Sequence, residues 1–155
     1  MKPKLYLEST IPSYLASWPS RDLIVAGHQQ ITQEWWNNRS RHFNLYISQF
    51  VLDEIALGDP IVSKQRLSRV KGIPLLGITE EVSILAADLI RSGIVPKKAA
   101  TDSAHIALAA VHGVDFLLTW NCTYIANATI VRKIERVCKA NGFMCPVICT
   151  PEELL

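Results

Sequence analysis

The sequence lacks any apolar run long enough to span a bilayer, so we expect no association with a membrane. It also lacks the apolar core of a secretion signal, because Glu8 interrupts the short apolar run that follows the basic start. The four cysteines do not have the spacing of a zinc site, and a chain of 155 residues can bury enough surface to fold without disulfides. We therefore expect reduced thiols and a cytoplasmic location.

The sequence also lacks a strong excess of charge of either sign. Sixteen basic and fourteen acidic residues give a net charge of +2, which is too small to indicate a nucleic-acid partner by itself. Residues 61–77 are an exception, because they contain no acid and four cations, namely Lys64, Arg66, Arg69 and Lys71. These side chains could contact phosphates, or they could simply cover a solvated helix. The sequence does not decide between the two interpretations.

Repeats, low-complexity tracts and long linkers are absent, which favours a single domain over residues 1–155. Short apolar runs alternate with helix-length segments, a pattern typical of a parallel sheet covered by helices. We predict a three-layer α/β/α sandwich with four to five parallel strands. The strands are expected at residues 5–7, 43–47, 74–76, 116–118 and 147–149. The main helices are expected at residues 22–38, 50–56, 61–70, 80–92, 100–112 and 127–141.

Two polar residues lie just beyond predicted strands. Glu8 follows the strand at residues 5–7, and Asn121 follows Thr119 and Trp120 after the strand at residues 116–118. Ligands of open parallel sheets bind beyond the carboxyl ends of the strands, so both positions are candidate site residues. Glu8 has a simpler alternative role, because an acid also stabilises the start of the helix that is expected to follow it.

Two further acids lie on the apolar faces of predicted helices. Glu54 falls within the apolar stripe of the helix at residues 50–56, where an unpaired carboxylate is costly. A cation, a buried ion pair or a head group that reaches water would each resolve that cost. Asp102 shares a helix face with Ile106 and Ala109, which turns its carboxylate towards the packed side.

Together, three carboxylates and one amide would form an oxygen-rich site suited to Mg2+ or Mn2+. Such ions activate water and stabilise the charge on a phosphate in hydrolysis. We therefore predict Glu8, Glu54, Asp102 and Asn121 as metal-binding and catalytic residues. His105 and His112 lie on one predicted helix, but the sequence offers no third ligand for a zinc site. We therefore expect His105 to pack half-buried.

The runs Tyr6–Thr10, Val51–Ile55, Thr101–Ala107 and Asp115–Asn121 resemble the PIN domain family in order and spacing. The resemblance implies a parallel sheet between helices and a ribonuclease similar to the VapC toxins of bacterial toxin-antitoxin pairs. It further implies RNA as substrate, Mg2+ or Mn2+ as cofactor, and a cognate antitoxin and a homodimer as partners. The family usually has aspartate where this chain has Glu8 and Asn121, and these replacements favour a weaker site with one ion.

The leading hypothesis is a metal-dependent endoribonuclease. Glu8, Glu54 and Asp102 would bind the metal, and Asn121 would be a neutral ligand or would orient water. For the substrate, Ser9 and Thr10 could contact a phosphate or hold Glu8, and Trp18 and Trp120 could stack on bases. One alternative is a catalytically weakened PIN-like domain that binds RNA or a protein partner. Another is a magnesium-dependent hydrolase of small phosphates.

Overall fold

The computed structural model describes all residues, 1–155, and contains a four-stranded sheet. Every strand pair is parallel, and the strands lie in the order β2-β1-β3-β4. The strands are β1 (Lys4–Leu7), β2 (Asn44–Tyr46), β3 (Phe116–Leu118) and β4 (Val147–Cys149). Central β1 is buried from Leu5 to Leu7, which explains its uninterrupted apolar sequence. The predicted all-parallel sheet is confirmed.

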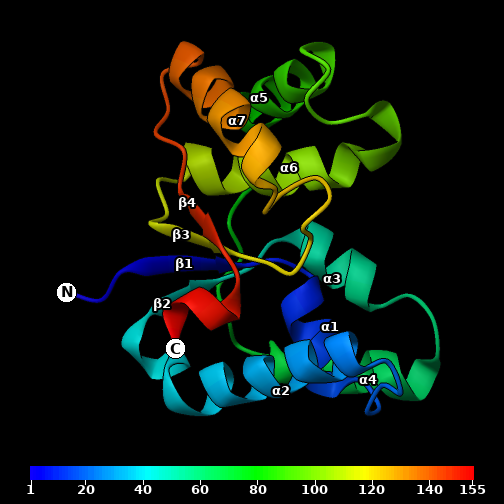
Figure 1. Ribbon diagram of the computed structural model, residues 1–155. Coiled ribbons are helices and arrows are strands. Elements are labelled where there is room, and N and C mark those ends of the chain that lie inside the picture. Colours follow the sequence, from blue (N-terminus) through cyan, green and yellow to red (C-terminus); the bar gives the residue numbers. More distant parts are fainter.

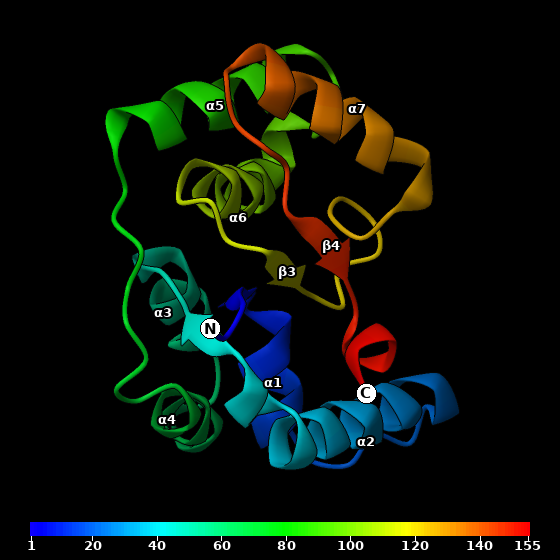
Figure 2. The ribbon, with the colours of Figure 1, turned by 90° about the vertical axis from the view of Figure 1, so that its left-hand side faces the viewer.

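Helices cover both faces of the sheet (Figures 1 and 2). The helices α1 (Thr10–Ala16), α2 (Leu23–Asn38) and α4 (Pro60–Arg69) lie on one face. On the other face lie α5 (Glu80–Arg91), α6 (Ala100–Val111) and α7 (Ala128–Ala140). The short helix α3 (Gln49–Ile55) contacts both α4 and α6. Three 3-10 turns complete the chain: η1 (Ser40–His42), η2 (Lys97–Ala99) and η3 (Pro151–Leu154). The predicted α/β/α sandwich is therefore confirmed.

The path of the chain reverses next to β1. It leaves β1 through α1 and α2 to form β2 on one side, and it later returns through α6 to form β3 on the other side. In parallel sheets such a reversal opens a crevice at the carboxyl ends of the two strands, where ligands bind. The Glu8 N–H donates to the Leu118 carbonyl at 3.1 Å, so the residues that follow β1 and β3 are neighbours at this edge of the sheet.

The predicted strand at residues 74–76 is not a strand. Leu75 forms only an isolated parallel bridge with Ile47, and the Ile47 N–H donates to the Pro74 carbonyl at 3.0 Å. Pro74 has no N–H to extend a ladder, and Leu75 is half exposed. The sheet therefore keeps four strands, the lower end of the predicted range.

Helix α6 is the most deeply buried helix, and it positions part of the site. All eight residues from Ser103 to Ala110 are buried, because the small alanine side chains let the helix pack closely against its neighbours. The helix ends at Val111, and Gly113 follows with a φ of 62°, in the left-handed region that glycine adopts without strain. No helix of the chain is both long and apolar enough to cross a membrane.

Candidate metal centre

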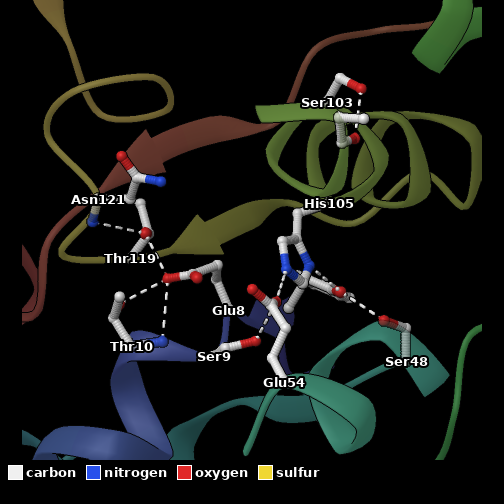
Figure 3. Close-up of polar contacts among 11 residues, drawn as sticks. Glu8, Ser9, Thr10, Ser48, Glu54, Ser103, His105, Thr119 and Asn121 are labelled. Carbon is white, nitrogen blue, oxygen red and sulfur yellow. Dashed lines mark hydrogen bonds and ion pairs between the residues drawn. The ribbon is translucent and has the colours of Figure 1, made fainter. Parts of the chain in front are cut away.

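Glu8 lies directly after β1 and is only 3% exposed. One of its carboxylate oxygens, Oε1, accepts three hydrogen bonds (Figure 3). The donors are the Thr10 N–H at 3.1 Å, the Thr10 hydroxyl at 2.5 Å and the Thr119 hydroxyl at 2.6 Å. The other oxygen, Oε2, has no hydrogen-bond partner in the protein. A buried carboxylate thus has one oxygen fixed in place and one free for a ligand.

Glu54 projects from α3 towards the same place. Its Oε1 accepts the Ser9 hydroxyl at 2.6 Å and lies 2.5 Å from Nε2 of His105. Desolvation alone would raise the pKa of Glu54, but the hydrogen bond and charge of His105, together with the Ser9 hydroxyl, lower it below its ordinary value. The carboxylate of Glu54 is therefore held in its charged form.

His105 is fully buried, and both of its ring nitrogens have partners. While Nε2 faces Glu54, Nδ1 lies 2.7 Å from the hydroxyl of Tyr6, which in turn lies 2.7 Å from the hydroxyl of Ser48. Burial raises the pKa of Tyr6 far above its ordinary value, so its side chain stays a neutral phenol. The hydroxyl groups can rotate, so this chain of contacts can hold the ring with a hydrogen on either nitrogen.

Asp102 lies one turn before His105 on α6 and is half-buried. Desolvation by burial raises the pKa of Asp102, and the nearby charges of Glu8 and Glu54 raise it further. The amide of Asn121 and the ring of His105 act against this shift. Four groups from different parts of the chain are therefore close enough to Asp102 to influence its charge.

Asn121 uses its carbonyl oxygen within its own loop. Oδ1 accepts the N–H groups of Thr123 at 3.2 Å and Tyr124 at 3.0 Å, which occupies both of its lone pairs. In Figure 3 the amide nitrogen of Asn121 points towards the side of α6. The oxygen that would bind a metal is therefore engaged within the loop, and the amide nitrogen is left to bond the carboxylate of Asp102.

No lysine or arginine is paired with the acids of the site. The ion pairs of the chain are Arg91 with Asp88, and His105 with Glu54. Glu8, Glu54 and His105 each offer one ligand atom, and these atoms lie within 4.8 Å of one another. Carboxylates that lie close together repel one another, and a bound cation offsets that repulsion. This group could therefore hold a metal ion.

The structure brings together the four predicted residues Glu8, Glu54, Asp102 and Asn121. The hydroxyl residues hold these acids in place, with Thr10 bound to Glu8 as predicted. Ser9 binds Glu54 instead of Glu8, and it makes no capping bond for α1.

The prediction that His105 only packs half-buried is wrong, because the ring is fully buried and contacts Glu54. Its i+3 spacing from Asp102 puts it on the same helix face, and that signal could have identified it. Thr119 was missed as a site residue as well, although it directly follows β3.

The predicted base-stacking residue Trp120 packs inside the protein. It is 8% exposed, its Nε1–H donates to Thr32 at 2.7 Å, and the ring of His28 stacks on it with centroids 3.9 Å apart. Little of the indole surface is left for a base. By contrast, Trp18 is 73% exposed.

One cation of the basic helix has a structural role. Arg66 donates from Nε to the Ile55 carbonyl at 2.9 Å and from Nη2 to the Leu57 carbonyl, so it satisfies the end of α3. Lys64 is exposed on the same helix and makes no ion pair, so it stays a candidate for phosphate contact.

No protein-family model and no curated protein matches this sequence, so a functional assignment has to come from the geometry of the site.

Proposed function

We propose that the chain is a metal-dependent endoribonuclease of the PIN type, similar to the VapC toxins, which hydrolyses RNA phosphodiester bonds in the cytoplasm. The main support is a set of three acids, Glu8, Glu54 and Asp102, near the carboxyl ends of β1 and β3, with no lysine or arginine paired to them. An oxygen-rich site of this kind suits Mg2+ or Mn2+.

A divalent ion there would lower the pKa of a water molecule and stabilise the charge that develops on the phosphate. Glu8 and Glu54 hold their carboxylates ready for the ion, since Thr10, Thr119 and Ser9 fix one oxygen of each. Asp102 would be the third acid to face the ion, because burial and the charges of Glu8 and Glu54 raise its pKa and a bound cation would offset that repulsion. We assign Asn121 to orienting the carboxylate of Asp102.

The test is a calorimetric titration of the metal-free protein with Mn2+, followed by incubation with structured RNA. We expect the wild type to bind Mn2+ at millimolar concentration or below and to cleave the RNA, and Asp102→Ala to do neither. Asp53→Ala is a matched control, because Asp53 is an exposed acid on α3 whose side chain contacts only Gln49. A wild type that binds no divalent ion at millimolar concentration would disprove the nuclease assignment.

A catalytically weakened PIN-like domain that binds RNA or a protein is the second candidate. It is favoured by Asn121, whose oxygen is engaged in its loop, so the site offers three acids where the family usually has four. RNA that is bound with Mn2+ but stays intact would favour this candidate. Cleavage of small phosphate esters with intact RNA would instead favour a small-phosphate hydrolase.

The proposal includes two protein partners, a cognate antitoxin and a second copy of the chain. The antitoxin would be encoded by a short neighbouring reading frame, and its product should copurify with this chain and suppress RNA cleavage. Sedimentation of the purified chain tests the homodimer directly.

A further inference from the structure

The contact between His105 and Glu54 needs a hydrogen or a cation between the two atoms. Nε2 of His105 and Oε1 of Glu54 are 2.5 Å apart, and two lone pairs cannot face each other at that distance. Either a hydrogen on Nε2 or a metal ion beside both atoms satisfies the contact. The oxygen of Glu8 that completes the group lies within 4.8 Å of both ligand atoms, which leaves the three groups around one point.

The ring of His105 is held in the way that metal-binding histidines are held. Such a ligand usually donates its second ring N–H to an oxygen, which fixes the tautomer and leaves the other nitrogen for the metal. Here Nδ1 lies 2.7 Å from the hydroxyl of Tyr6, which can pass its own hydrogen on to Ser48. All three side chains are fully buried, so packing prevents the ring from turning away from the acids.

Glu8 supplies an independent indication of a ligand. Glu8 is only 3% exposed, and Oε1 accepts all three of its hydrogen bonds. Oε2 is left without a partner, next to a second carboxylate and an imidazole. This oxygen is not sealed off from solvent, since the buried polar atom that lacks a partner in the structure is Nε1 of Trp35, and it is open to a cation that reaches the acids.

We propose that His105 is a direct nitrogen ligand of the metal ion, together with Glu8 and Glu54, and that the site therefore prefers Mn2+ to Mg2+. The inference rests on the proposed metal-dependent function and specifies its cofactor. Mg2+ takes oxygen ligands almost exclusively and gives up its water reluctantly, whereas imidazole suits the transition metals. One nitrogen in an otherwise oxygen-rich set thus selects between two ions of equal charge.

The experiment uses pulsed EPR of Mn2+ bound to the full chain, together with Mn2+ and Mg2+ affinities from calorimetry. In the wild type we expect hyperfine coupling to a histidine nitrogen, which changes when the protein is grown with isotopically labelled histidine. We also expect Mn2+ to bind at least about tenfold more tightly than Mg2+. Substitutions of residues around a metal site change its metal affinity by a similar factor.

His105→Gln separates a ligand from a residue that only orients Glu54. Glutamine can still donate an N–H to Glu54, but it has no imidazole nitrogen. We expect His105→Gln to lose the nitrogen coupling and most of the preference for Mn2+, and the matched control His112→Gln to keep both. His112 directly follows the last residue of α6, and its ring contacts the Gly77 carbonyl.

Two results would overturn the inference in different ways. If the wild type binds Mn2+ without nitrogen coupling, His105 only orients Glu54, and the proposed function survives. If the wild type binds no divalent ion, the proposed function fails together with the ligand assignment. The labelled wild type decides between these results without any variant, so the test stands even if His105→Gln does not fold.

Discussion

The hydroxyl of Thr119 donates to Oε1 of Glu8 at 2.6 Å, across 111 positions of the chain. The two residues directly follow the neighbouring strands β3 and β1. The same hydroxyl oxygen accepts the N–H of Asn121 at 2.9 Å, and Thr119 is fully buried. A single hydroxyl therefore joins the ends of two strands to the first acid of the site.

Thr119→Val keeps the shape of the side chain but removes this hydroxyl. The Asn121 N–H then loses its acceptor and Glu8 loses one of three donors, so the free energy of unfolding should fall by about 1–3 kcal/mol. Urea denaturation measures this loss, and calorimetry should show weaker Mn2+ binding as well. Thr123→Val is the control, because Thr123 is exposed and its hydroxyl makes no hydrogen bond. Equal stability of the two variants would show that the Thr119 hydroxyl does not support the site.

Asp102→Asn should stabilise the metal-free protein at neutral pH. The pKa of Asp102 is raised in the folded state, so stability is greatest below the ordinary value of 3.8 and falls as the pH rises through the folded value. Asparagine removes the charge that causes this loss. We expect the melting temperature to rise by at most about 2–4 °C, because solvent screens a half-exposed group and should limit the gain to ~1 kcal/mol.

This gain should disappear well below pH 3.8, where the carboxyl group of Asp102 is neutral in both states. Melting curves at the two pH values test it, and added Mn2+ should stabilise the wild type only. A variant that melts lower than the wild type at neutral pH would contradict the raised pKa of Asp102.

Glu54→Gln should have the opposite effect. The pKa of Glu54 is lowered in the folded state, so its charge adds stability above the ordinary value of 4.5, and this stability is lost as the pH falls through the lowered value. The side chain is 37% exposed, and screening by solvent should limit the loss to less than ~1 kcal/mol. Melting curves should show Glu54→Gln below the wild type at neutral pH and equal to it in strong acid. Stabilisation by this variant would show that His105 and Ser9 do not favour the charged carboxylate.

Trp18 and Trp120 should respond differently to substitution. Trp120→Phe removes the hydrogen bond to Thr32 and part of the stack on His28, so it should lower the free energy of unfolding by about 1–3 kcal/mol and leave RNA affinity unchanged. Trp18→Ala should leave stability unchanged but weaken RNA binding, because an exposed indole can stack on a base. Chemical denaturation and fluorescence anisotropy with labelled RNA measure the two effects. The assignment is wrong if Trp120→Phe weakens RNA binding at unchanged stability.

Local sequence patterns determined most of the fold. The positions of α5, α6 and α7 follow from apolar periodicity and from the glycines that end each helix, and these features act within a few residues. The strand expected at residues 74–76 failed because pairing at a sheet edge depends on distant partners and not on the apolar run itself. Helix-face spacing was also sufficient to identify Glu54 and Asp102, since a carboxylate on an apolar face is visible without knowledge of the fold.

Only the tertiary structure decided how the site is connected. Glu54 meets Ser9 and His105, which are 45 and 51 positions away, and no local pattern contains such pairs. The sequence by itself therefore determined the α/β class and the acids of the site. Parallel crossovers bring distant residues to one edge of the sheet, and three details of the site depend on them. These are the oxygen of each acid that is occupied, the direction of the Asn121 carbonyl, and the place of His105 among the acids.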